Sequence, residues 1–281
     1  MQAFEVPRAV SAAAAIASSL GLAVDDAVLL NVSNKLAVRL RPCDAVARVA
    51  LDTDHVAPFE VDIARRLAER ASPVARLDPR VEPRVYERDG FALTLWTYYE
   101  PLPGRSTAPA AYAEALARLH AGMGGLDVPA PHVTERIQQA RELLASRERT
   151  PALAGADREV LRRAVQDLSP AITRGAGAEQ LLHGEPHPGN LLATQQGPLF
   201  IDLETCCRGP VEFDLAHAPE DVAEHYPGAD PDVLRACRML VLAMITTWRW
   251  DRDDRLPGGR ALAAQWLSQL RVMLDRHGAT G

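Results

Sequence analysis

The polar side chains best suited to chemistry lie in two neighbouring segments, HGEPHPGN at residues 183–190 and FIDLE at residues 200–204. Glu185 precedes Asn190 by five residues, so a carboxylate and an amide share one tight loop. A hairpin after this loop would return Asp202 toward Asn190. Phosphoryl transfer needs a carboxylate that orients the acceptor and takes its proton, and hard oxygen ligands for Mg²⁺. The spacing predicts Glu185 as the catalytic base and Asn190 and Asp202 as the metal ligands.

The elements that come before these segments are mostly strands. A helix at residues 7–20 ends at Gly21, and Val- and Leu-rich strands are expected at residues 27–32, 35–40 and 45–51. The apolar spacing of residues 58–70 favours one buried helix face. Two further strands are expected at residues 84–87 and 91–97. The pattern predicts a first lobe of about five antiparallel strands with one inserted helix.

The pattern changes at residues 98–104, where two prolines and a glycine within four residues predict a linker. Helices are then expected at residues 109–120, 133–146, 157–168, 231–250 and 260–277, and short strands at 191–194 and 198–203. The predicted fold class is therefore α+β, with a small β-rich lobe at residues 1–99 and a larger, mostly helical lobe at residues 100–281. We expect the first lobe to bind nucleotide and the second to hold the catalytic loop and the acceptor.

The catalytic segment resembles a known family. Residues 183–190 resemble the HGDxHxxN motif of the aminoglycoside phosphotransferase and choline kinase superfamily, which is similar in fold to protein kinases. Residues 200–204 look like that family's metal-binding strand end. Residues 209–216 resemble the segment that follows it, in which Asp214 would brace the catalytic loop. The resemblance extends from about residue 31 to about residue 216 and implies a protein-kinase-like, two-lobed fold.

The resemblance also implies nucleotide-binding residues in the first lobe. VARV at residues 46–49 looks like the strand that carries a phosphate-contacting Lys, here Arg48, and Glu60 matches the acid that pairs with it. The hinge would include Trp96 and Tyr98, whose backbone groups would bind the base. The Ser33 hydroxyl is either a further phosphate contact or part of an ordinary turn.

The implied activity is an Mg²⁺-dependent transfer of the γ-phosphate of ATP or GTP to a hydroxyl of a small molecule. The acceptor would be an antibiotic, a metabolite or a choline-like compound. Glu185 stands where most members hold Asp, and Arg48 stands where they hold Lys. These two differences leave open an alternative, a catalytically weak nucleotide-binding or regulatory module of the same fold.

Other side chains near the motif allow more than one interpretation. His183 is expected to hold the loop through backbone hydrogen bonds, and His187 to do the same or to position substrate. The two histidines also suggest a zinc site, but the glycines and prolines between and beside them prevent a regular helix. Glu204 is either a further carboxylate near the metal or a partner of Arg208.

A second polar group lies near the end of a predicted helix. Trp248, Trp250 and Asp251 would line an acceptor pocket, in which a carboxylate favours an amine and an aromatic ring stacks on a sugar or a cation. The alternative is a helix end with packed tryptophans and solvated salt bridges.

The composition narrows the class of protein. The chain has 281 residues and a formal net charge of -6, which argues against non-specific nucleic-acid binding. Four cysteines without a CxxC pair are typical of a reduced, cytoplasmic protein. Residues 9–24 are too short and too weakly apolar for a comfortable membrane span. The expected partners are therefore a nucleotide and a small-molecule acceptor, with no nucleic acid and no membrane. The chain contains a single lysine, Lys35.

Overall fold

The structure is a computed structural model that describes residues 5–33, 35–51, 56–102, 104, 106–174 and 179–278. The chain forms two compact units, Met1–Gly122 with Gly189–Thr205, and Met123–Pro188 with Cys206–Gly281. Each unit therefore combines two separate stretches of the sequence. The functional division into a nucleotide-binding part at residues 1–99 and an acceptor part at residues 100–281 stays a prediction.

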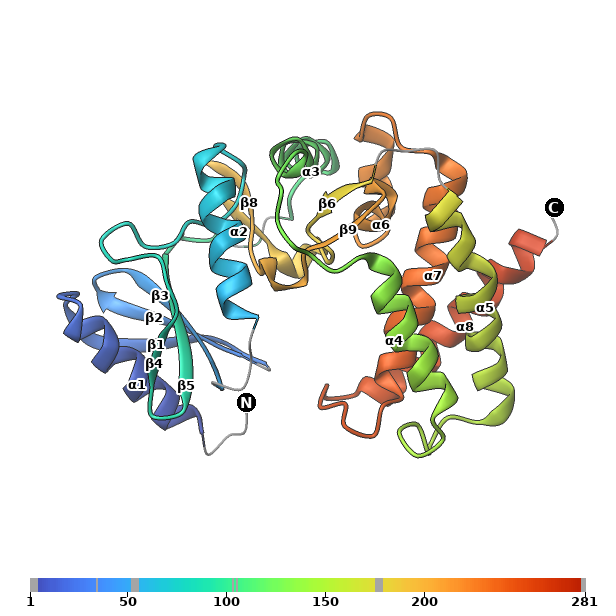
Figure 1. The fold of residues 1–281 in the computed structure, drawn as a ribbon, viewed down its shortest axis with the longest axis horizontal. Coiled ribbons are helices and arrows are strands. Elements are labelled where there is room, and N and C mark those ends of the chain that lie inside the picture. Colours follow the sequence, from blue (N-terminus) through green and yellow to red (C-terminus); the bar gives the residue numbers. More distant parts are fainter. Residues whose placement is uncertain are drawn as a thin grey trace. The chain divides into compact units, whose positions relative to one another are not determined.

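The first unit is built on an antiparallel sheet of five strands in the order β1-β2-β3-β5-β4 (Figure 1). The strands are β1 (Val24–Val32), β2 (Leu36–Pro42), β3 (Ala45–Leu51), β4 (Tyr86–Arg88) and β5 (Phe91–Thr97). Buried and less buried residues alternate along β2 and β3, as expected when one face of a sheet meets a core. The predicted five-stranded first lobe is confirmed.

Helix α1 (Val6–Ser19) covers this core. Its buried side chains, mostly alanines such as Ala9 and Ala13 but also Ile16, pack with Leu36, Val38 and other buried residues of the sheet. A stripe of alanines lets a helix approach a sheet closely, and burial of apolar area there contributes about 25 cal/mol per Å². Gly21 follows the helix with a φ of 82°, a left-handed conformation that favours glycine.

The first unit also contains α2 (Ala57–Glu69), α3 (Pro109–Met123) and the hairpin of β7 (Leu191–Thr194) and β8 (Gly197–Phe200). Phe200 joins this hairpin to the segment after α2, because its N–H donates to the Pro73 carbonyl at 2.8 Å and its carbonyl accepts from the Ala75 N–H at 2.9 Å. The ring of Phe200 is fully buried and meets Tyr112 of α3 edge-on. The strand end before Asp202 is therefore fixed to its surroundings.

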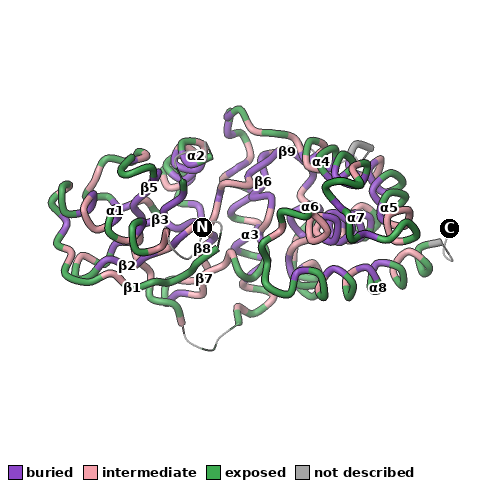
Figure 2. Tube along the Cα trace, turned by 90° about the horizontal axis from the view of Figure 1, so that it is seen from below, coloured by how far each residue is buried: buried purple, intermediate pink, exposed green. Residues whose placement is uncertain are grey.

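The second unit is mainly helical. Its long helices are α4 (Val133–Ala145), α5 (Gly155–Arg174), α7 (Pro231–Arg249) and α8 (Gly259–Gly278). Helix α7 packs against the other three, and Figure 2 shows it as mostly buried, whereas α8 alternates between buried and exposed residues. This difference follows the sequence, since α7 is apolar around most of its circumference.

Short elements connect these helices and surround the loop at residues 183–188. They are β6 (Gln180–Leu182), which pairs with β9 (Cys207–Gly209), then α6 (Val211–Leu215) and the 3₁₀ helix η3 (Glu220–His225). Sequence patterning did not identify β6 and β9, because three residues are too few to show a period of two. The described helices include none with the length and apolar character that a membrane crossing requires.

Several predicted element boundaries are wrong, among them the ends of α5 and β8. Helix α5 continues past Pro170 to Arg174, beyond the predicted end at Leu168, and its last turns bury Ile172 in the core of the unit. Strand β8 ends at Phe200 and not at Leu203. Asp202 has a φ of 67°, which interrupts the extended backbone, and the 3₁₀ helix η2 (Leu203–Thr205) follows.

Candidate active site

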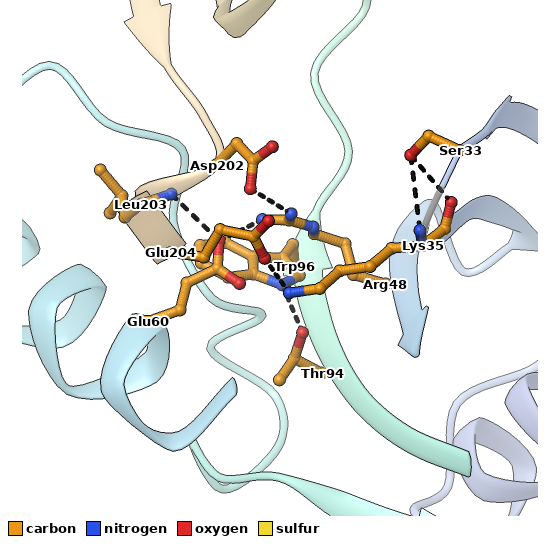
Figure 3. Close-up of polar contacts among 9 residues, drawn as sticks. All are labelled: Ser33, Lys35, Arg48, Glu60, Thr94, Trp96, Asp202, Leu203 and Glu204. Carbon is orange, nitrogen blue, oxygen red and sulfur yellow. Dashed lines mark hydrogen bonds and ion pairs between the residues drawn. The ribbon is translucent and has the colours of Figure 1, made fainter. Parts of the chain in front are cut away.

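Arg48 lies at the centre of a charged cluster in the first unit (Figure 3). Its guanidinium forms an ion pair with Glu60, and its Nη2 donates to Asp202 Oδ1 at 2.6 Å. Arg48 comes from β3, Glu60 from the first turn of α2, and Asp202 from the segment that follows β8. The planar guanidinium of Arg48 thus connects three elements that are far apart in the sequence.

Glu60 is the most deeply buried carboxylate of this cluster. Its side chain is 2% exposed, and its Oε1 also accepts the Leu203 N–H at 3.1 Å. Burial raises the pKa of Glu60, while the positive charges of Arg48 and Lys35 act in the opposite direction. For Arg48, burial opposes the charge, but Glu60 and Asp202 raise its pKa above the ordinary value. The two carboxylates therefore keep Arg48 charged, and the buried Glu60 carboxylate needs the positive charge of Arg48 as its partner.

The β7–β8 hairpin places Asn190 near the cluster. The Ile201 N–H donates to the Asn190 carbonyl at 3.0 Å, so the residue before Asp202 lies beside Asn190. The side chain of Asp202 is 31% exposed, and its φ of 67° belongs to the left-handed region that Asp and Asn tolerate better than most residues. The amide and carboxylate oxygens of these two residues are hard donors of the kind that suit Mg²⁺.

Glu204 forms an ion pair with Lys35 at the same cluster (Figure 3). Arg208, the partner suggested for Glu204, donates to the carbonyls of Leu126 and Val128, each at 3.2 Å. Glu204 instead adds a third carboxylate to the Arg48 cluster. Within the described residues, no group of three or more His, Cys, Asp or Glu side chains is arranged as a metal site.

The predicted hinge residues lie on or after β5. Trp96 is 5% exposed, its Nε1 donates to Thr94 Oγ1 at 2.8 Å, and Arg48 lies over its ring at 5.9 Å. Tyr98 is partly buried, with the Arg39 guanidinium 3.7 Å from its ring centroid. The Tyr98 N–H already donates to the Asp44 carbonyl at 3.2 Å. Other backbone groups of this segment would therefore have to contact a base.

The turn before β2 contains Ser33. Its Oγ donates to the Lys35 carbonyl at 3.2 Å, and its N–H donates to the same carbonyl at 2.9 Å. Asn34, the other residue of the suggested hairpin turn, lies outside the described residues. The turn thus fixes the backbone from which Lys35 extends.

In the second unit, Asp214 of α6 holds the loop that carries Glu185. Its fully buried carboxylate accepts the His183 N–H and the Gly184 N–H, both at 2.8 Å. His183 is also fully buried, and its Nδ1 faces the Glu185 N–H at 3.4 Å. His187 is exposed, and its N–H donates to the Glu185 carbonyl at 2.8 Å. The residues around Glu185 are therefore ordered by backbone hydrogen bonds.

Arg136 of α4 binds the Glu185 carboxylate, a contact that sequence reasoning missed. Its Nη2 forms an ion pair with Glu185 Oε1, and its Nη1 donates to the Gly184 carbonyl at 3.0 Å. A capping box at His132 and Glu135 begins the helix just before Arg136 and fixes its direction. No motif in the sequence marks Arg136, because its partner lies 49 residues away.

Among the suggested acceptor residues, Trp248 contacts Arg136, the partner of Glu185. The Arg136 guanidinium is 5.3 Å from the Trp248 ring centroid, so one arginine touches both the ring and Glu185. Trp250 instead meets Arg260 at 5.3 Å, and Asp251 pairs with Arg149. Burial raises the pKa of Asp251, but the Asp253 N–H and Arg149 outweigh this effect and lower it.

His217, two residues after α6, was not identified from the sequence. Its ring meets Phe213 edge-on at 5.3 Å between centroids, and its Nε2 is shielded from solvent without a hydrogen-bond partner among the described residues. Burial lowers the pKa of His217 to about 4, although the charges of Glu185 and Asp214 act in the opposite direction. His217 therefore adds a neutral imidazole near Glu185.

Most of the chain matches the model of one protein family. The model of the phosphotransferase enzyme family matches residues 27–270. That range contains all the candidate site residues described above. No curated protein sequence matches the chain.

Solved structures support the same fold. A choline/ethanolamine kinase family protein from Mesorhizobium loti has a TM-score of 0.71 at 19% identity, over 96% of this chain and 94% of that one. The amicoumacin kinase hAmiN, in complex with AMP-PNP, Ca²⁺ and Ami, has a TM-score of 0.68 at 14% identity, over 96% of each chain. A GDP complex of wild-type aminoglycoside 2'-phosphotransferase-IIIa has a TM-score of 0.63 at 14% identity, over 100% and 99%. The predicted kinase-like α+β fold is confirmed.

Proposed function

The chain belongs to the phosphotransferase enzyme family, and from this membership we propose that it is a kinase that transfers the γ-phosphate of ATP or GTP to a hydroxyl group of a small molecule. The observation that carries the proposal is the bridge of Arg48 to Glu60 and Asp202. Phosphoryl transfer depends on charges fixed around the phosphates more than on covalent chemistry. This bridge supplies such charges on three connected elements.

Asn190 and Asp202 are the residues that would hold Mg²⁺. Their oxygens match the ion's preference for hard ligands, and the partial exposure of Asp202 leaves its carboxylate accessible. When bound, Mg²⁺ neutralises negative charge on the phosphates. Arg48 adds positive charge beside them, and Glu60 fixes the position of Arg48.

Glu185 would orient the acceptor hydroxyl and take its proton as the oxygen attacks the γ-phosphorus. Glu is one methylene longer than Asp, and positioning errors of about one ångström reduce rates strongly. Arg136 and the Asp214-held backbone offset the extra freedom of the longer side chain, because they fix the carboxylate and its loop. The Glu185 geometry is therefore consistent with catalysis despite the difference in residue type.

The donor would be bound near the segment of Trp96 and Tyr98. Among the structurally similar proteins, one is a complex with AMP-PNP and another with GDP, which supports a nucleotide donor without choosing between the bases. Trp248 contacts Arg136, the partner of Glu185, and the exposed His187 lies on the Glu185 loop, so they are the better candidates for acceptor contacts. Trp250 already contacts Arg260, and Asp251 already forms an ion pair with Arg149.

The proposal is tested by a screen of acceptors. Purified protein is incubated with Mg²⁺ and either ATP or GTP against aminoglycosides, amino alcohols and sugars, and phosphorylated products are detected by mass spectrometry. We expect product with at least one acceptor and none without added acceptor. Tight binding of Mg·ATP without product across the whole panel would favour the alternative, a nucleotide-binding regulatory module.

A further inference from the structure

Lys35 is the one lysine of the chain, and its side chain reaches the charged cluster around Arg48. It stands between Ser33 and the start of β2, the strand that pairs with β3. Its ammonium forms an ion pair with Glu204, and only 13% of its side chain is exposed (Figure 3). Partial burial of a lysine at a charged cluster calls for a reason, because lysine side chains are usually solvated.

The backbone on either side of Lys35 directs it toward this cluster. The Lys35 carbonyl accepts hydrogen bonds from the N–H and the Oγ of Ser33, at 2.9 Å and 3.2 Å. The next residue, Leu36, is fully buried and pairs with Val49 of β3. The turn and the strand together fix the direction of the Lys35 stem.

Arg48 is less suited to a direct phosphate contact than its position suggests. Its two terminal nitrogens each bind a carboxylate, Glu60 on one side and Asp202 on the other. Turning toward a phosphate would separate Arg48 from Glu60, which is 2% exposed and would remain buried without its charge partner. A rigid, planar fork held at both ends is better suited to positioning those carboxylates.

Lys35 has the opposite properties. Its partner Glu204 is 26% exposed, so releasing or sharing that carboxylate leaves no buried charge unpaired. An ammonium is a compact charge with three donors on a flexible stem, and it can contact a carboxylate and phosphate oxygens together.

We propose that Lys35, from the turn before β2, makes the direct cationic contact with the phosphates of the bound nucleotide, whereas Arg48 acts as a positioning residue for Glu60 and Asp202. This inference rests on the proposed kinase function. It moves the direct phosphate contact from Arg48 on β3, where the sequence predicts it, to Lys35 in the turn before the neighbouring strand β2.

Because the chain has one lysine, amine labelling reports on this residue directly. An acyl phosphate derivative of ATP transfers its acyl group to a nearby amine, which forms an amide and loses a proton, while the nucleotide leaves with its phosphate. Peptide mapping by mass spectrometry should find the acyl group on Lys35, and excess Mg·ATP should prevent it. Labelling of the N-terminal amine serves as the internal reference and should not respond to Mg·ATP.

Variants provide the second measurement. Nucleotide affinity, measured by calorimetry, should fall at least ~10-fold in Lys35→Met, because a hydrogen bond between charged groups is lost. Lys35→Arg should recover part of the affinity. Arg41→Met, near the other end of β2, removes an arginine that pairs with Asp26 and should bind nucleotide as the unchanged protein does.

The outcomes separate this inference from the proposed function. If the unchanged protein binds nucleotide but Lys35→Met binds it equally well and labelling is not prevented by Mg·ATP, the inference is overturned and the kinase proposal stands. If the unchanged protein binds neither ATP nor GTP, both are overturned. Should Lys35→Met fail to fold, protection of Lys35 in the unchanged protein decides the question alone.

Discussion

Replacement of Arg48 by Met should strongly destabilise the first unit. The substitution keeps an unbranched side chain of similar length but removes the charge that faces Glu60 and Asp202. Glu60 is 2% exposed and would retain the Leu203 N–H as its hydrogen-bond donor. One neutral donor cannot replace an ion pair in a buried setting, so the folded state would contain an uncompensated carboxylate.

The expected loss follows from the burial of each partner. Breaking a buried ion pair by removing one member costs about 3–5 kcal/mol. Glu60→Gln should cost less, about 1–2 kcal/mol, because the amide oxygen still accepts the Leu203 N–H and Arg48 retains Asp202. In the double variant, the loss of unfolding free energy should be about 2 kcal/mol smaller than the sum of the two single losses.

The assay is urea-induced unfolding of the four proteins, followed by tryptophan fluorescence at neutral pH. Arg41→Met serves as the matched control, because its partner Asp26 is half exposed and such surface pairs contribute about 0–1 kcal/mol. If Arg48→Met lost less than about 1 kcal/mol, or if the two single losses simply added, the claim that Glu60 depends on Arg48 would be refuted.

Three further predictions concern the second unit. Glu185→Gln should lose most of the turnover with little change in nucleotide affinity, as measured by kcat and calorimetry; equal turnover would exclude Glu185 as the base. Asp214→Ala should cost about 3 kcal/mol in urea unfolding, since the buried His183 and Gly184 N–H groups lose their acceptor; a loss below about 1 kcal/mol would contradict this. His217 has a pKa lowered to about 4 in the fold, below the ordinary 6.5, so the unfolded chain binds the proton more tightly and stability falls as pH falls from about 6.5 to about 4. Between pH 7 and pH 5, the free energy of unfolding of His217→Phe should therefore fall by about 1–2 kcal/mol less than that of the unchanged protein. Identical dependence of the unfolding free energy on pH in the two proteins would disprove the burial effect.

Much of the fold could be predicted because it follows local patterns. Strand β3 alternates buried and less buried side chains, and its predicted bounds at residues 45–51 agree with the structure. Helix α2 places its apolar residues on one face, and its bounds were predicted within one residue. Patterns of this kind depend on burial alone and are visible in any stretch longer than about two periods.

The exceptions have a physical cause as well. Strands β6 and β9 have three residues each and pair with one another across 24 intervening residues, from Leu182 to Cys207. Neither strand is long enough to show a pattern, and the pairing depends on the rest of the fold. The end of β8 was misplaced because apolar residues, Ile201 and Leu203, flank Asp202 on both sides, whereas the backbone turns at Asp202.

The candidate site shows the same limit for charged residues. The segments with Glu185, Asn190 and Asp202 were found because they resemble a family motif at fixed spacing. Arg136 was missed, since it is one of many arginines and only the structure identifies its partner. Lys35 had a signal, its uniqueness in the sequence, but nothing local indicated that it reaches a carboxylate 169 positions later.

The role of Asp202 is tested most directly by Asp202→Asn, compared with the unchanged protein using the best acceptor from the screen. Asn keeps the shape, tolerates the φ of 67° and still accepts a hydrogen bond from Arg48, but it removes the negative charge. We expect the variant to fold normally and to lose at least ~100-fold in kcat, because removal of one electrostatic contact at such a site typically costs two to three powers of ten. Turnover within a few-fold of the unchanged protein would contradict the account.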